Sequence, residues 1–223
     1  MRRPRERRGL VLAVSITSAF VTVGLSVLGW GGPATFLAHR ARIAFLVLVV
    51  LMTIVGMLSP VNLSSGERED PSSRALFLPT TIAMLFLAWV MPHMDRGDLW
   101  TIDGDVARWT GVATLLVGGV IRIWPMFVLG YRFSAFVAIQ PGHELVTTGP
   151  YRYVRHPSYL GMMLGLVGWA LVFRSSIGLV VAGLGMPLLV DRIDSEEALL
   201  ASHFGAQYAD YRRRTWRLVP GLY

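Results

Sequence analysis

Four apolar segments of about 20 residues occupy most of the first 130 positions, and they constrain the fold more than any other feature. They cover about residues 10–30, 43–59, 75–91 and 106–129. A helix of about 20 residues crosses the roughly 30 Å hydrocarbon core of a bilayer. Charged types make up only 16% of the 223 residues, and the mean hydropathy is +0.52. Soluble domains carry about a quarter charged residues, so the sequence predicts a polytopic membrane protein.

Proline and glycine mark the expected ends of these segments. Pro33, Pro60 and Pro92 follow the first, second and third segments, where proline is expected to end a helix. The fourth segment contains Pro125, which predicts a kink, and Arg122. An arginine at membrane depth must face protein or water rather than lipid.

The last 93 residues alternate polar and apolar segments, and they are expected to form a second region at residues 131–223. Residues 131–157 are too polar to span a bilayer. Residues 158–190 are apolar, contain six glycines and are interrupted at 173–176, which predicts two closely packed helices joined by a short turn. Residues 191–211 are expected to form an amphipathic helix that leaves the bilayer. The predicted fold is therefore an all-α transmembrane bundle, with four helices in residues 1–130 and a helical hairpin after them.

The net charge is +7, and every positive side chain is an arginine. With the amino terminus inside, the inner segments carry 15 arginines (five, two, three and five) and the outer segments carry five. This bias satisfies the positive-inside rule. It predicts a multi-pass protein with both termini in the cytoplasm, and the bacterial-style use of arginine alone indicates a bacterial plasma membrane. The positive charge is therefore explained by orientation of the protein in the lipid membrane, and no nucleic-acid partner is predicted.

Two polar clusters in the second region could carry chemistry. Residues 148–151 form a Gly-Pro turn, and Pro157 suits the first turn of a helix. Free amides and the helix dipole there favour an anionic group, although Arg155 and Tyr159 could equally anchor the protein at the lipid headgroups. Arg192 and Glu196 lie four residues apart on one helical face, either as a structural salt bridge or aimed at an interfacial pocket.

Several kinds of site lack support in the sequence. Cysteine is absent, which excludes thiolate metal sites and a cysteine nucleophile. Of the histidines only His156 is near His143, and no third ligand is evident, so no metal site is predicted. Neither a Walker loop nor a GxGxxG or GxSxG motif is present.

The polar clusters together resemble the isoprenylcysteine carboxyl methyltransferase family, which is related to the phospholipid N-methyltransferases. The resemblance covers about residues 131–220. It rests on His143-x-Leu145-Val146-Thr147-x-Gly149-x-Tyr151, Arg155-His156-Pro157-Ser158-Tyr159-x-Gly161, Arg192-x-x-x-Glu196-Glu197, Phe204-Gly205-x-x-Tyr208-x-x-Tyr211 and Arg217-x-x-Pro220. The chain departs from the eukaryotic members at Asp194-Ser195, where they have further acidic residues.

The resemblance implies an integral membrane enzyme that uses S-adenosyl-L-methionine. It implies that Arg192 and Glu196 are catalytic and lie beside the acceptor. The residues it implies for the cofactor are His143, Glu144, Leu145, Val146, Tyr151, Arg155, His156, Pro157, Ser158 and Tyr159. The acceptor would be a lipophilic small molecule or lipid that carries a carboxylate or an amine, and arginine-only usage speaks against a prenylated protein. Two alternatives are an NADPH-dependent sterol-type reductase and a non-catalytic membrane scaffold; the oligomeric state is not assigned.

Overall fold

The computed structural model describes residues 4–59, 68–69, 71–130, 138–139 and 144–223. Its long helices are α1 (Pro4–Trp30), α3 (Arg40–Leu58), α4 (Pro71–Arg96), α5 (Asp105–Leu129), α6 (Pro157–Val172), α7 (Ser176–Leu184) and α8 (Met186–Phe204). Its short elements are α2 (Pro33–Phe36), the 3₁₀ helix η2 (Gly149–Arg152), α9 (Ala206–Arg213) and the two-residue strands β1 (Arg68–Glu69) and β2 (Ala138–Ile139), which pair in antiparallel fashion.

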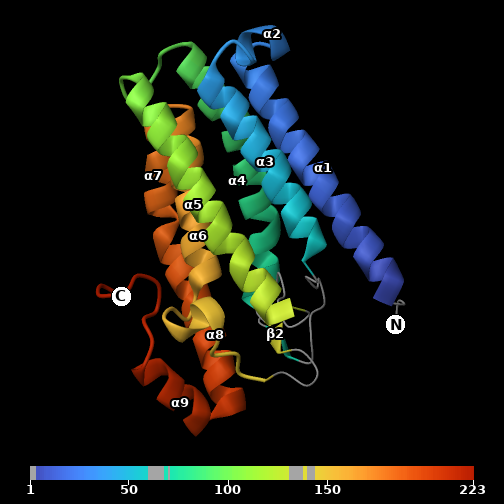
Figure 1. Ribbon diagram of the computed structural model, residues 1–223, viewed down its shortest axis with the longest axis vertical. Helices are drawn as coiled ribbons and strands as arrows, with labels where there is room; N and C mark the ends of the chain where they lie inside the picture. Colours follow the sequence, from blue (N-terminus) through green and yellow to red (C-terminus); the bar gives the residue numbers. More distant parts are fainter. Residues whose placement is uncertain (1–3, 60–67, 70, 131–137, 140–143) are drawn as a thin grey trace.

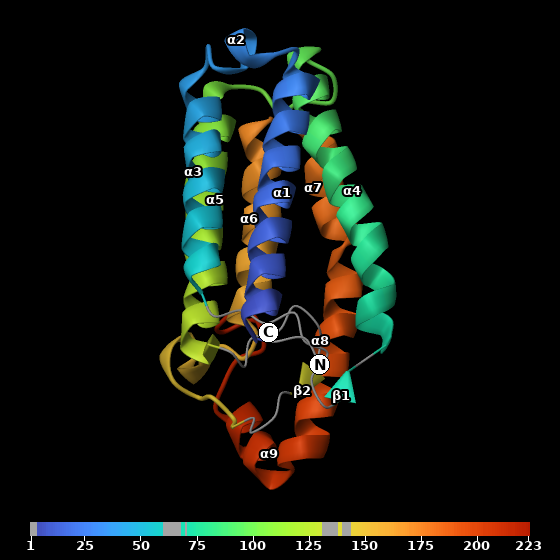
Figure 2. The ribbon, with the colours of Figure 1, turned by 90° about the vertical axis from the view of Figure 1, so that its right-hand side faces the viewer.

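The long helices lie side by side in an elongated bundle (Figure 1). We call its two ends the α2 end and the α9 end. The connection between α6 and α7 lies at the α2 end. At the opposite end α1 begins, and α8 extends beyond the other long helices to reach α9 (Figure 2). The segment that precedes α6 and the segment that follows α9 both lie toward the α9 end, so the polar segments of the second region gather there.

The predicted all-α membrane bundle is confirmed. Within the described residues, four segments are long and apolar enough to cross a membrane: Leu12–Trp30, Arg40–Leu58, Asp105–Leu129 and Ser176–Phe204. The last of these combines α7 and α8, which follow each other at Gly185. Together with α6, a shorter apolar helix, it forms the predicted hairpin, which turns at residues 173–175.

The structure differs from one expectation for the third apolar segment. Residues 75–91 lie within α4, and their crossing of the membrane stays a prediction. Pro92 does not end the helix, which continues to Arg96. A proline removes one intrahelical hydrogen bond, and packing in a bundle can compensate for that loss. Here Pro92 is fully buried, and the turn that follows it carries the buried Asp95.

The closest helix packing joins α5 to α6 through glycines. A Cβ atom added at Gly161 of α6 would lie 2.4 Å from the backbone nitrogen of Arg122, and one added at Gly168 would lie 2.4 Å from that of Leu115. Small residues permit such close approach of helices. The hairpin glycines were expected to pack α6 against its hairpin partner. Gly178 does so against Ala170, whereas Gly161 and Gly168 pack against α5.

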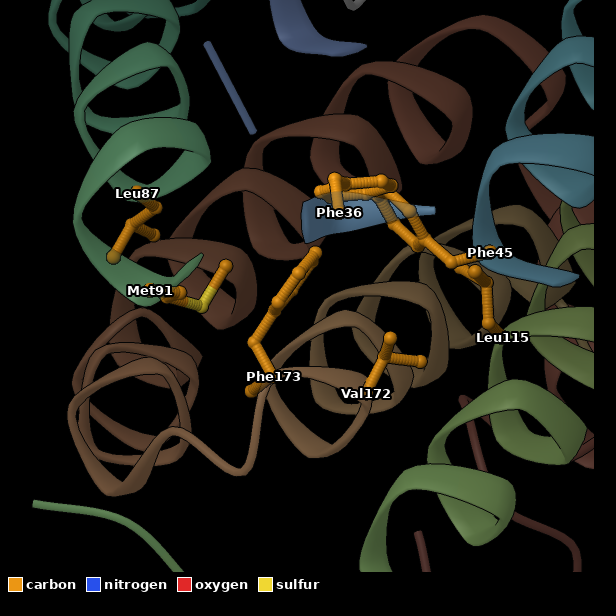
Figure 3. Packing of buried hydrophobic residues seen from close by; sticks show 8 residues of the cluster. Phe36, Phe45, Leu87, Met91, Leu115, Val172 and Phe173 are labelled. Atoms are coloured by element: carbon orange, nitrogen blue, oxygen red, sulfur yellow. The ribbon is translucent and has the colours of Figure 1, made fainter. Parts of the chain in front are cut away.

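An apolar core fills the bundle near the α2 end (Figure 3). Phe45 and Phe173 meet edge to face, with ring centroids 5.2 Å apart. The other buried members of this cluster are Phe36, Leu87, Met91, Leu115, Ala170 and Val172. They come from α2, α4, α5 and α6, so the core ties the two regions of the sequence together.

A buried ion-pair network closes the α2 end. Asp95 is only 2% exposed, and its Oδ2 atom lies 2.5 Å from a guanidinium nitrogen of Arg108. Nε of Arg174 donates to Oδ1 of Asp95 at 2.8 Å. Arg108 also donates to the carbonyl oxygen of Val172 at 3.0 Å. A buried carboxylate requires such partners, and these ones join α4, α5 and the turn between α6 and α7.

Candidate functional site

The first turn of α6 is held in place by the segment that follows α9. The backbone N–H groups of Arg155 and His156 donate to the carbonyl oxygens of Trp216 and Arg217 at 2.8 and 3.1 Å. Pro157 is the first residue of α6, which suits its fixed φ and missing N–H. His156 is the N-cap residue, but its side chain makes no capping hydrogen bond. The imidazole instead contacts Glu197 of α8.

His156 points at two adjacent carboxylates of α8. Its Nε2 atom lies 3.2 Å from Oε1 of Glu197, and its Nδ1 atom lies 3.9 Å from Oε1 of Glu196. The histidine is 4% exposed and Glu197 is 6% exposed. The predicted motif at the start of α6 therefore meets the predicted motif on α8 inside the protein.

The hydroxyl group of Tyr159 lies between Arg192 and Glu196. It donates to Oε2 of Glu196 at 2.7 Å and accepts from Nε of Arg192 at 2.8 Å. The sequence predicted that the arginine and the glutamate share a helical face, and they do lie one turn apart on α8. The bridging tyrosine was not predicted. It fixes both side chains to α6, so the three groups form one hydrogen-bonded unit.

Glu197 is the centre of a second group of contacts, and the sequence did not assign it to the site. Nε of Arg155 donates to its Oε1 atom at 2.8 Å. Nε of Arg212 lies 3.6 Å from Oε2, and Nε of Arg217 lies 3.7 Å from Oε1. One carboxylate thus connects the start of α6, α8, α9 and the segment after α9. Arginines that surround a buried carboxylate stabilise its charged form.

A cavity of about 380 Å³ opens beside this carboxylate. Its walls carry charges of both signs and two aromatic rings. The lining residues are Arg155, Asp194, Glu197, Arg212, Thr215, Trp216, Arg217 and Tyr223. Arg217 also pairs with Asp194, which places a second ion pair in the wall.

Two residues connect the site to the rest of the bundle. Tyr151 of η2 is buried, and the hydroxyl of Tyr211 in α9 donates to its backbone carbonyl at 2.8 Å. Burial raises the pKa of the Tyr151 phenol above its ordinary value, and the charge of Glu196 adds to this effect. From α5, a guanidinium nitrogen of Arg122 donates to Oγ of Ser158 at 2.6 Å. The expectation that Arg122 faces protein is confirmed.

The structure brings together part of the predicted site. Arg155, His156, Ser158 and Tyr159 lie at the start of α6, and three of them contact Arg192, Glu196 or Glu197 of α8. Glu144, Leu145 and Val146 precede η2 in non-helical backbone; the glutamate is exposed and the other two are half-buried. Their role in cofactor binding stays a prediction. His143 lies outside the described residues.

Sequence reasoning missed Glu197, Arg217 and Arg122 as members of the site. A charged residue inside an apolar helix was the available signal for Arg122. The other two were visible only as parts of the family pattern, because their contacts come from segments distant in sequence. The described residues contain no group of three histidine or acidic side chains that could hold a metal ion.

Part of the chain is similar in sequence to known proteins. Residues 111–202 match the model of the isoprenylcysteine carboxyl methyltransferase family. A protein-S-isoprenylcysteine O-methyltransferase of Dictyostelium discoideum is 28% identical over 175 residues, which are 76% of this chain and 70% of that protein. The enzymes with this name from Schizosaccharomyces pombe and Mus musculus are 36% and 34% identical over 52% and 50% of this chain. The matches span only 50% and 40% of those two proteins.

A solved structure is also similar. It is described as the eukaryotic intramembrane Ras methyltransferase, an isoprenylcysteine carboxyl methyltransferase; it covers 95% of this chain at 20% identity, with a TM-score of 0.48. The family match spans most of α5 and α8 and all of α6 and α7, which are the helices that carry Arg122, Tyr159, Arg192 and Glu196. In sequence, residues 111–202 of this chain are similar to the isoprenylcysteine carboxyl methyltransferase family.

Proposed function

We propose that this protein transfers a methyl group from S-adenosyl-L-methionine to the carboxylate of a lipophilic acceptor. The observation that carries the proposal is the unit formed by Tyr159, Arg192 and Glu196 at the end of a membrane hairpin. It lies in the segment that matches the methyltransferase family. A hydrophobic acceptor can approach between the apolar helices, whereas the polar cofactor enters from water at the α9 end.

The residues at the α9 end fit the chemistry of this cofactor. Its amino-acid moiety carries a carboxylate and an ammonium group, which suit the arginines and the acidic side chains of the cavity. The cavity volume of about 380 Å³ falls within the roughly 300–1,000 Å³ of small-molecule sites. The half-buried Leu145 and Val146 offer apolar surface for an adenosyl group. When bound, the cofactor supplies an electrophilic methyl group on a sulfonium sulfur.

For the protein's own residues we assign roles as follows. Arg192 holds the acceptor carboxylate, because a guanidinium group matches a carboxylate with two parallel donors. Glu196 and Tyr159 fix the orientation of Arg192. An acceptor carboxylate is already ionised, so it would need no general base to accept the methyl group that the cofactor would supply. Alignment of the two reactants then supplies most of the rate enhancement.

The choice of a carboxylate over an amine rests on two considerations. The matched relatives are named as O-methyltransferases that act on a protein isoprenylcysteine. An amine would require a general base, and Glu196 already accepts a hydrogen bond from Tyr159. We further propose that the α9 end faces the cytoplasm, where the cofactor is made available. The 15 arginines assigned to the inner side support that orientation.

Ligand binding and turnover by the purified protein test this proposal. S-adenosylhomocysteine should raise the melting temperature, since a ligand at 100 times its dissociation constant adds about 2.7 kcal/mol of stability. Labelled S-adenosylmethionine should label N-acetyl-S-isoprenylcysteine but not its methyl amide, which lacks the carboxylate. Labelling of phosphatidylethanolamine instead would indicate an amine acceptor. A melting shift with NADPH and none with S-adenosylhomocysteine would refute the proposal.

A further inference from the structure

Arg122 has no place in the mechanism above, yet it contacts the residue that precedes Tyr159. We propose that Arg122 is a positioning residue of the methyl-transfer site, which acts through Ser158 to hold the hydroxyl of Tyr159 between Arg192 and Glu196. This inference rests on the proposed function for its kinetic consequence. Its structural consequence, a change at Tyr159, can be measured without turnover.

The contacts of Arg122 fix the first turn of α6 against α5. One guanidinium nitrogen donates to Oγ of Ser158 at 2.6 Å and lies 3.4 Å from its carbonyl oxygen. The Ser158 hydroxyl in turn lies 3.5 Å from the carbonyl oxygen of Arg122. The backbones are also in close contact, because a Cβ atom at Gly161 would reach the Arg122 nitrogen. The two helices therefore cannot slide or rotate here without breaking these contacts.

The neighbouring residue transmits this constraint to the site. Successive residues of a helix point about 100° apart, so Ser158 faces α5 while Tyr159 faces α8. The phenol extends far from the helix axis, and a small rotation of the first turn displaces its hydroxyl group. Hydrogen bonds weaken steeply outside their narrow range of distances, so such a displacement would release Arg192 or Glu196.

Arg108 offers a matched control on the same helix. It is also an arginine of α5 that donates to a backbone carbonyl of α6, in this case Val172 at 3.0 Å. The two arginines are separated by 14 residues, or about 21 Å along a helix. Arg108 therefore fixes the end of α6 at the α2 end, remote from Tyr159. Replacement of either arginine weakens the α5–α6 pair, but only Arg122 should affect the site.

Kinetics of the two arginine variants test the inference. Arg122→Lys keeps the charge and loses the planar fork, and it should lower kcat about 10- to 100-fold, since a misplacement of about 1 Å can cost about 10²-fold. Its melting shift with S-adenosylhomocysteine should remain. Arg108→Lys should lower the melting temperature at least as much and leave kcat within about twofold of the parent. If Arg122→Lys does not fold, Ser158→Ala tests the same contact, because it removes the hydroxyl to which Arg122 donates. It should show part of the expected loss in kcat.

A double-mutant cycle separates positioning from a purely structural role. If Arg122 acts through Tyr159, adding Arg122→Lys to Tyr159→Phe should cost little further kcat, because the contact that it positions is already absent. Full additivity, or a parent-like kcat for both Arg122→Lys and Ser158→Ala, would overturn the inference.

Fluorine NMR provides the readout that needs no activity. The protein has seven tyrosines, so 3-fluorotyrosine labelling gives a small set of resonances, and Tyr159→Phe identifies that of Tyr159. Arg122→Lys should shift or broaden this resonance, and Arg108→Lys should not. An unchanged Tyr159 resonance would overturn the inference even if the enzyme is active. If the parent transfers no methyl group, the proposed function fails, and the resonance alone decides whether Arg122 positions Tyr159.

Discussion

At the scale of single residues, the hydroxyl of Tyr159 determines the geometry of the site, because it contacts Arg192 and Glu196 at once. Tyr159→Phe removes only this oxygen. A hydrogen bond to a charged group is worth about 1.5–3 kcal/mol, so we expect methyl transfer to fall about 10- to 100-fold. Turnover by the purified variant measures this loss. Tyr153→Phe, which alters an exposed tyrosine nearby, should be neutral; equal losses in the two variants would contradict the assignment.

Glu196→Gln distinguishes the two classes of acceptor. With a carboxylate acceptor Glu196 only orients its neighbours, so the variant should show a modest loss, mainly as a higher KM for the acceptor. A general base for an amine would instead contribute about 10²–10⁴-fold to kcat. Steady-state kinetics measure the difference, and the affinity for S-adenosylhomocysteine serves as the control. If Glu196→Gln lost cofactor affinity, Glu196 would have to be assigned to the cofactor site.

The sequence predicted the components of the site better than their connections. The spacing of Arg192 and Glu196 indicated a shared helical face, and the motif at residues 155–159 indicated a helix start. The Tyr159 bridge depends on the rotation of α6 relative to α8, which no local pattern encodes. The partners of Glu197 come from three segments that only the tertiary fold brings together.

At the scale of helices, the α5–α6 contact tolerates no added methyl group at Gly161. Gly161→Ala would place Cβ 2.4 Å from a backbone nitrogen of α5, and overpacking of this kind costs about 1–3 kcal/mol. We expect a lower melting temperature in detergent. Gly165→Ala, one turn later, meets no heavy atom within 4 Å and should be neutral or stabilising by up to about 1 kcal/mol. Similar melting temperatures for the two variants would refute the close packing.

Helix lengths were predictable, but helix partners were not. The apolar runs predicted α1, α3, α5 and the hairpin, because the length of a span follows from the thickness of the bilayer. The glycines of α6 indicated close packing without specifying which helix they approach. The continuation of α4 through Pro92 was also not predictable, since it depends on the packing around Pro92 and Asp95.

At the scale of the whole molecule, the protein has a charged centre at each end of the bundle. The Asp95 network closes the α2 end, and the Glu197 network closes the α9 end. We predict that the α9 end is cytoplasmic. A reporter fused after Tyr223 should be active in the cytoplasm, and one inserted in residues 97–104 should be active outside. The reverse pattern would separate the candidate site from its cofactor and contradict the arginine bias.

The pairing of residues 155–156 with residues 216–217 has a consequence for biosynthesis. The apolar helices can enter the membrane one after another as the ribosome makes them. The start of α6 acquires its backbone partners only when residues 216–217 have emerged, about 60 positions later. Until then Glu197 also lacks Arg212 and Arg217. A chain that stops before residue 212 would therefore insert its spans and still lack a formed site, so assembly of the site has to wait for residues 212–217.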